Sequence, residues 1–126
     1  MNNNRQIGRA GEFLAAYILE QHDVRCTHVD IERDDLWGVA ASKNFYRIQV
    51  KAASKPLLHA KHHKTPKYSF ETRKLKGYRG IVIFAALDVG LILCQLGSEI
   101  KNQSYKVKPE LFTVEAQTAS IYRCFT

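Results

Sequence analysis

An acid, an amide and a lysine occur at strand spacing in residues 35–51, DLWGVAASKNFYRIQVK. The pattern predicts two strands joined by a polar turn at residues 42–44. Gln49 and Lys51 would share one face, and this turn would place Asp35 directly across from Lys51. Carboxylate and amide oxygens are ligands that Mg²⁺ accepts beside water and phosphate oxygens, and a lysine can hold a water or offset charge on a phosphate. The stretch therefore predicts a site for a divalent cation and a phosphate.

The strand that carries Gln49 and Lys51 alternates polar residues with Ile48 and Val50. Such alternation is typical of a strand with one buried face. A surface hairpin with scattered polar residues is the alternative, and it fits many Asp, Gln and Lys trios. The regular alternation favours the site, because it gives the polar side chains a face of their own.

The pattern D…QVK has its acid, Asp35, fourteen residues before Gln49, and the upstream segment GRAGE at residues 8–12 precedes an apolar run. Together they resemble the core of the PD-(D/E)XK nucleases, in particular group I intron homing endonucleases and Holliday-junction resolvase-like members with Q-x-K in place of E-x-K. The resemblance covers about the first 51 residues and the later segment 81–95. It implies that Glu12 is the helix acid of the site, Asp35 the metal-binding Asp, and Gln49 with Lys51 the third motif.

The sequence departs from the family pattern at two points. No proline precedes Asp35, and Asp34 stands beside it, so the choice between the two acids depends on the register of the hairpin. Gln49 lacks the charge of a glutamate, which weakens metal binding and leaves an inactive descendant open.

Composition points to one globular domain with a polyanionic partner. The chain has 126 residues, 45% of them hydrophobic, and a formal net charge of +7. We expect a single domain over residues 1–126, DNA as partner rather than a membrane, and a cytoplasmic location. Cys26, Cys94 and Cys124 are far apart and without metal-ligand spacing, so all three are predicted to be small buried hydrophobes.

The N-terminal segment predicts a helix from Arg5 to His22 with Asn4 as its cap. By periodicity alone Glu12 lies outside the apolar side and would be a solvated acid; only the resemblance places it in the site. Gly8 and Gly11 indicate close approach of a backbone or phosphate, or a frayed first turn. The predicted apolar side consists of Ile7, Ala10, Leu14, Tyr17, Ile18 and Gln21.

A strand from Val24 to Ile31 leads into an acidic cluster. The cluster would provide a negative field that attracts a divalent cation, or it would be a solvated loop. Trp37 is predicted on the site face beside Gln49, as core packing rather than a base-stacking platform. The acids of the cluster are Asp30, Glu32, Asp34 and Asp35.

The segment from Ala52 to Arg79 is strongly basic and is predicted to contact nucleic acid. We expect a short helix near residues 57–63 and a strand near residues 68–72, with Phe70 and Tyr78 among the cations. A solvated basic face is the alternative. The predicted contact residues are Lys55, Lys61, His62, His63, Lys64, Lys67, Tyr68, Arg73, Lys74 and Lys76.

Two apolar runs, residues 81–87 and 91–96, predict strands joined at residues 88–90 and placed at the centre of a sheet. Residues 105–108 alternate like an edge strand, and residues 109–125 fit a helix or another strand pair equally well. The expected fold is α/β: one helix on a mixed, largely antiparallel sheet of four or five strands, with other helices on the opposite face. The resemblance implies a restriction-endonuclease-like core.

The predicted function is Mg²⁺-dependent hydrolysis of DNA phosphodiesters by a site-specific, homing-type endonuclease, with Mn²⁺ as a possible substitute. Asp35, Gln49 and Glu12 would hold the metal, with the Val50 carbonyl as a further candidate, and Lys51 would orient the water. One centre per chain implies a homo-oligomer, either a dimer or a tetramer, for cutting both strands.

Three alternatives stay open at the level of sequence. The chain could be a Holliday-junction resolvase-like nuclease, or a nucleic-acid-binding module that has lost its chemistry. It could also be an RNA-processing nuclease, which would need a general base such as His59, His62 or His63.

Overall fold

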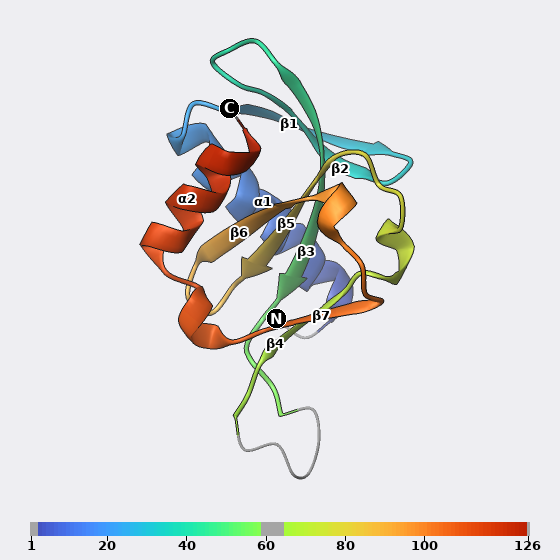
Figure 1. The fold of residues 1–126 in the computed structure, drawn as a ribbon, viewed down its shortest axis with the longest axis vertical. Coiled ribbons are helices and arrows are strands. Elements are labelled where there is room, and N and C mark those ends of the chain that lie inside the picture. The colour runs from blue at the N-terminus through green and yellow to red at the C-terminus, as the bar shows by residue number, and fades with distance from the viewer. Residues whose placement is uncertain (1–2, 59–64, 126) are drawn as a thin grey trace.

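The computed structural model describes residues 3–58 and 65–125, and its main element is a five-stranded sheet in the order β1-β2-β3-β5-β6 (Figure 1). β3 and β5 are parallel and the other neighbouring pairs are antiparallel, which confirms the predicted mixed, largely antiparallel sheet. The strands are β1 (Arg25–Ile31), β2 (Asp34–Val39), β3 (Phe45–Ala53), β5 (Ile81–Ala86) and β6 (Leu91–Leu96).

Helix α1 (Asn4–Gln21) packs on one face of this sheet. Its cap is Asn3, whose side chain accepts from the backbone N of Gln6 at 2.9 Å, so the predicted cap is one residue late. The predicted apolar side is wrong in part, since Tyr17 is 64% exposed. The small residues of the helix face the sheet instead, and their weak hydrophobicity hid this face in the sequence. The buried residues of α1 are Gly11, Ala15, Ile18 and Leu19.

The two glycines of α1 give opposite predictions for stability. At Gly11 an added Cβ would lie 2.5 Å from the Cβ of Ala52 in β3, whereas at Gly8 it would meet nothing within 4 Å. Gly11→Ala is therefore expected to lower the free energy of unfolding by about 1–3 kcal/mol through overpacking. Gly8→Ala is expected to raise it by about 0.5–1 kcal/mol, because alanine is the better helix former. Urea unfolding of both variants checks this, and a shift of the same sign in both would contradict the packing described.

Helix α2 (Val114–Cys124) resolves the open assignment of the C-terminal segment and protects the edge of the sheet. The side chain of Gln117 accepts from the backbone N of Ile92 at 2.8 Å, and the hydroxyl of Ser120 accepts from that of Cys94 at 3.0 Å. β6 is thus an edge strand, and the prediction that it lies at the centre is wrong, although β5 is buried throughout. Covering an edge in this way satisfies backbone groups that would otherwise template pairing with another chain.

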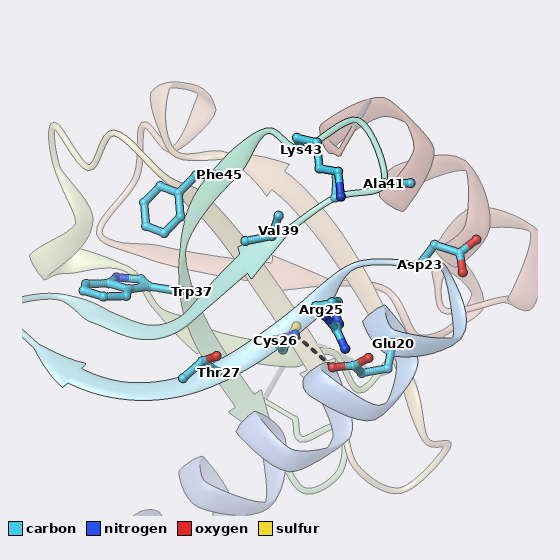
Figure 2. A pocket seen from close by; sticks show the side chains of 11 residues that line it. Glu20, Asp23, Arg25, Cys26, Thr27, Trp37, Val39, Ala41, Lys43 and Phe45 are labelled. Carbon is cyan, nitrogen blue, oxygen red and sulfur yellow. Dashed lines mark hydrogen bonds between the residues drawn. The ribbon is translucent and has the colours of Figure 1, made fainter.

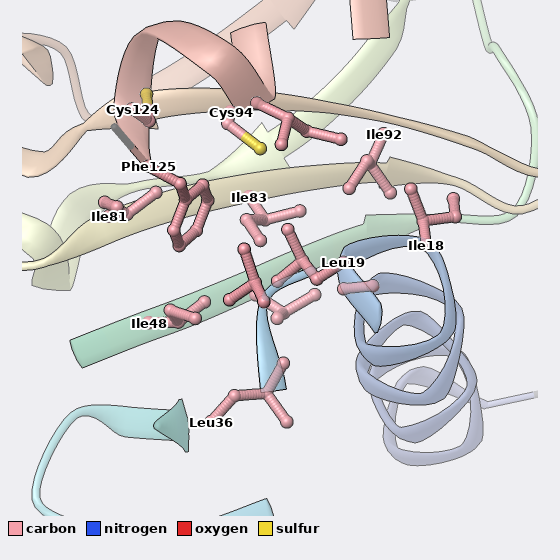
Figure 3. Packing of buried hydrophobic residues seen from close by; sticks show 14 of the residues in the cluster. Ile18, Leu19, Leu36, Ile48, Ile81, Ile83, Ile92, Cys94, Cys124 and Phe125 are labelled. Carbon is pink, nitrogen blue, oxygen red and sulfur yellow. The ribbon is translucent and has the colours of Figure 1, made fainter. Parts of the chain in front are cut away.

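Both α-helices contribute to one apolar cluster, shown in Figure 3, together with residues of β2, β3, β5 and β6. The expectation of helices on the opposite face is therefore wrong. That face is covered by a two-stranded antiparallel sheet of β4 (Tyr68–Glu71) and β7 (Ser104–Val107), which confirms both predicted strands. Short 3₁₀ turns are η1 (Arg73–Leu75), η2 (Gly97–Glu99) and η3 (Pro109–Leu111).

The predicted helix near residues 57–63 is wrong at its start, because Leu57 forms an antiparallel bridge with Lys67. The rest of that prediction lies outside the described residues. The three cysteines are free thiols. Cys94 and Cys124 are buried as expected, whereas Cys26 is only half-buried. No helix within the described residues combines the length and apolarity that a membrane crossing requires.

Candidate active site

The turn between β2 and β3 fixes how Asp35, Gln49 and Lys51 lie relative to one another. The backbone N of Ala40 donates to the carbonyl of Asn44 at 3.0 Å, and Lys43, with φ of 73°, takes the left-handed conformation. The turn therefore starts and ends one residue earlier than predicted. Leu36 pairs with Ile48, and continuing this register sets Asp35 opposite Gln49. The prediction that Asp35 lies directly across from Lys51 is thus wrong by two residues, a shift that keeps all three on one side of the hairpin.

Asp35 lies where β2 and β3 separate. Their pairing ends at Leu36 and Ile48, while β3 continues beside β5 to Ala53. One carboxylate oxygen of Asp35 accepts from the backbone N of Val50 at 2.8 Å, in place of a strand carbonyl, and from Nε2 of Gln49 at 2.8 Å. The side chain of Asp35 thus fills the fork between the two strands and meets Gln49 there.

Lys51 acts on Asp35 through charge. Burial raises the pKa of Asp35 above its ordinary value, and the nearby carboxylates of Asp30 and Asp34 add to this. The hydrogen bond from Val50 and the charge of Lys51 lower the pKa but do not outweigh the burial. The ion pairs of the described residues involve arginines and one histidine, and Lys51 is in none of them. Its ammonium group is therefore not committed to another carboxylate.

Glu12 reaches the same place from α1. Its side chain is 26% exposed, and its pKa is raised by burial and then by the charge of Asp35. Nδ1 of His28 lies 3.8 Å from its carboxylate. Glu12 and Asp35 both line a groove of about 600 Å³ between α1 and the edge of the sheet, so periodicity misassigned Glu12 as a purely solvated acid. The groove is lined by Asn4, Arg5, Gly8, Arg9, Glu12, Phe13, His28, Val29, Asp30 and Asp35.

Asp34 has a different environment from its neighbour. It is 3% exposed and accepts, each at 2.8 Å, from Nε1 of Trp37, Nε of Arg47 and the hydroxyl of Tyr78. Burial raises its pKa, but these three donors together outweigh it and the pKa is lowered. Asp34 is therefore held as a buried anion within the fold, and the geometry selects Asp35 as the acid of the groove.

The acidic cluster divides between these two environments. Asp30 lines the groove and raises the pKa of both Glu12 and Asp35. Glu32 instead lies 3.6 Å from the guanidinium of Arg47, on the side of Asp34. A negative field at the groove would thus come from Asp30, Asp35 and Glu12, of which only the first two belong to the cluster.

The donor set suits a hard cation better than zinc. Within residues 3–58 and 65–125, no group of three or more His, Cys, Asp and Glu is placed to hold a metal ion. Glu12 and Asp35 supply two carboxylates and Gln49 an amide oxygen. Mg²⁺ needs only one or two carboxylates, because it keeps waters and takes substrate oxygens. Burial and neighbouring carboxylates raise the pKa of both acids, and a bound divalent cation would favour their charged forms.

The predicted nucleic-acid surface is only partly exposed. Tyr68 is 1% exposed and donates to Asp88 at 2.7 Å, so its predicted contact with nucleic acid is wrong. Phe70 and Tyr78 are buried in the same cluster, because the aromatics of this segment form the second core. Four of the predicted residues, Lys61, His62, His63 and Lys64, lie outside the described residues, as does His59. Exposed positions are Lys55, Arg73, Lys74 and Lys76, while Lys67 is half-buried.

A larger hollow of about 930 Å³ is lined by residues of β1, β2 and β3 and of the end of α1 (Figure 2), and none of the carboxylates of the groove is among them. Its wall includes Trp37 and Phe45, whose rings meet edge to face at 5.6 Å. The hydrogen bond from the backbone N of Cys26 to Glu20 closes one side. Trp37 is thus not beside Gln49: it pairs with Arg47 across the strands.

Comparison with known proteins gives a similarity of fold. No family model matches this chain, and no curated protein matches it. The chain is similar to the structure of a bacterial homing endonuclease, I-Ssp6803I, with a TM-score of 0.67 and 14% identity, over 86% of this chain and 77% of that one. The two chains therefore share a fold, an α/β core with a mixed sheet and flanking helices.

Proposed function

We propose that this chain is a metal-dependent DNA endonuclease of the PD-(D/E)XK type that cuts at specific sites as a homo-oligomer. The observation that carries the proposal is the hydrogen bond between Asp35 and Gln49 at the β2–β3 fork, with Glu12 in the same groove as Asp35. Lys51 lies two residues beyond Gln49 on β3 and lowers the pKa of Asp35 by its charge. The fold shared with a homing endonuclease and the net charge of +7 support a DNA substrate.

Asp35, Glu12 and the amide oxygen of Gln49 would hold Mg²⁺, for which Mn²⁺ would substitute. When bound, the cation would activate a water and stabilise charge on the phosphate and the leaving oxygen. Asp35 is positioned for this by its hydrogen bond from Val50, which fixes the carboxylate in the fork. Gln49 turns its amide N to Asp35, so its oxygen is the atom left to bind a ligand.

Lys51 would orient the attacking water and offset the negative charge that develops on the phosphate. One chain carries one such centre, so cutting both strands requires two chains, and a symmetric dimer or tetramer would match a palindromic target.

The test is incubation of the purified chain with supercoiled plasmid, linear duplex and four-way-junction DNA, each in Mg²⁺ and in chelator. We expect nicking or cleavage in Mg²⁺ and none in chelator. Preference for the junction would point to a resolvase-like activity, and preference for one duplex site to a homing-type activity. Cleavage in chelator, or binding of DNA without cleavage in either Mg²⁺ or Mn²⁺, would contradict the proposal.

A further inference from the structure

We infer that the cleaved strand reaches the carboxylates along the N-terminal half of α1, with its backbone against Gly8 and its phosphates at Arg5 and Arg9. The inference rests on the proposed function and adds a substrate-positioning surface on α1 to the basic segment 52–79 that the sequence predicts. We call the three residues Arg5, Gly8 and Arg9 the α1 ramp.

Helical spacing brings the α1 ramp to one face together with the candidate site. Residues 5, 8, 9 and 12 are three or four apart, so their side chains lie along one side of the helix. All four positions line the groove that contains Asp35. A ligand lying in this groove would therefore contact the ramp and Glu12 at once.

Gly8 has no role in the packing of the fold. An added Cβ at Gly11 would collide with β3, so the close packing of α1 on the sheet requires a glycine there. An added Cβ at Gly8 meets nothing within 4 Å. Glycine is unfavourable inside a helix compared with alanine. A bare helix surface that opens on a groove lets a sugar-phosphate backbone come closer than any side chain would allow.

The charges of the ramp suit a polyanion that must approach acids. Glu12, Asp30 and Asp35 would repel a phosphate strand, and Arg5 and Arg9 place two guanidinium groups beside them in the same groove. The guanidinium of Arg9 lies 5.4 Å over the ring of Phe13, which packs against His28 at 4.7 Å. Arg9 is thereby held at the groove wall, and guanidinium groups match phosphate oxygens in pairs.

The experiment uses the full chain and four variants in two matched pairs. Gly8→Leu fills the bare surface, and Gln6→Leu places the same side chain at an exposed position of α1 outside the groove. Arg5→Gln and Arg25→Gln remove the same charge, the first in the groove and the second on the distant hollow. Plasmid nicking in Mg²⁺, salt-dependent binding of a labelled duplex in chelator, and thermal unfolding are measured for each.

We expect Gly8→Leu to fold as stably as wild type and to nick at least about tenfold more slowly, as a misplaced strand would, while Gln6→Leu nicks like wild type. Arg5→Gln should reduce the slope of log K against log[salt] by about 1, and Arg25→Gln should leave it unchanged.

Normal nicking by a folded Gly8→Leu variant would overturn the inference and leave the proposed function standing. If Gly8→Leu does not fold, the arginine pair decides, and equal slopes for Arg5→Gln and Arg25→Gln would overturn the inference. Absence of binding and nicking in wild type would overturn the proposed function together with it.

Discussion

The variant Asp35→Asn is expected to lose at least about 100-fold of the Mg²⁺-dependent cleavage rate while its metal-free form unfolds at a higher temperature than wild type. Asparagine keeps an oxygen to accept from Val50 and Gln49, so the fork stays intact. The substitution removes a carboxyl group whose pKa is raised by burial and by the charges of Asp30 and Asp34. An ionised acid of raised pKa destabilises the folded state, so neutralising it stabilises the fold.

The pH dependence of stability follows the same sign. The cost of ionised Asp35 and Glu12 is fully present above their raised folded pKa values and is relieved as the pH falls through them. In chelator, the difference in unfolding temperature between Asp35→Asn and wild type should therefore become smaller as the pH is lowered from neutral. Thermal unfolding at several pH values measures this, and Asp23→Asn, remote from the groove, is the control with equal charge change. Equal cleavage by wild type and Asp35→Asn, or a lower unfolding temperature for Asp35→Asn, would count against the assignment.

The variant Asp34→Ala is expected to lose about 3 kcal/mol of unfolding free energy. It strips three donors, Trp37, Arg47 and Tyr78, of a shared acceptor. The hydroxyl of Tyr78 is buried and loses the acceptor of its hydrogen bond, whereas Arg47 is 36% exposed and is partly rehydrated. Urea unfolding at neutral pH measures the loss.

Tyr78→Phe serves as the matched variant, because it leaves Asp34 with two donors and should cost only about 1 kcal/mol. The stabilising contribution of Asp34 is present at neutral pH and lost as the pH falls through its lowered folded pKa, opposite in sign to Asp35. Addition of Mg²⁺ should still raise the unfolding temperature of Asp34→Ala. If Asp34→Ala loses little stability and its unfolding temperature does not rise with Mg²⁺, then Asp34 would be the metal ligand and Asp35 the structural acid.

The strands and their faces could be predicted from the sequence because they follow from local alternation. Ile48 and Val50 are buried while Gln49 and Lys51 are half-exposed, as period-2 alternation requires. The register was missed by two residues, because it depends on Lys43 adopting a left-handed conformation that residue type alone does not predict. A shift of two residues leaves each side chain on the same side of the hairpin. The predicted side for Asp35 is therefore correct, although its cross-strand partner is not.

Tertiary contacts explain the other differences. The buried face of α1 is marked by Gly11 and Ala15, whose value lies in their small size against β3 rather than in hydrophobicity. The aromatics Tyr68, Phe70 and Tyr78 form a core beneath a sheet that pairs β4 with the distant β7. No local pattern specifies that pairing, so the sequence alone predicts these residues on the surface. The role proposed for Arg5 and Arg9 is not predicted from the sequence, although their helical spacing from Glu12 is visible there.

Removal of the Lys51 ammonium tests most directly whether the fork hydrolyses phosphodiesters. In Lys51→Ala, plasmid nicking in Mg²⁺ should fall by about 100- to 1000-fold, the loss typical for one preorganised charge-stabilising donor. Binding of duplex DNA should stay within a few fold of wild type, and Lys101→Ala should retain both. Nicking by Lys51→Ala at the wild-type rate, or loss of binding in proportion to nicking, would contradict a catalytic site at this fork.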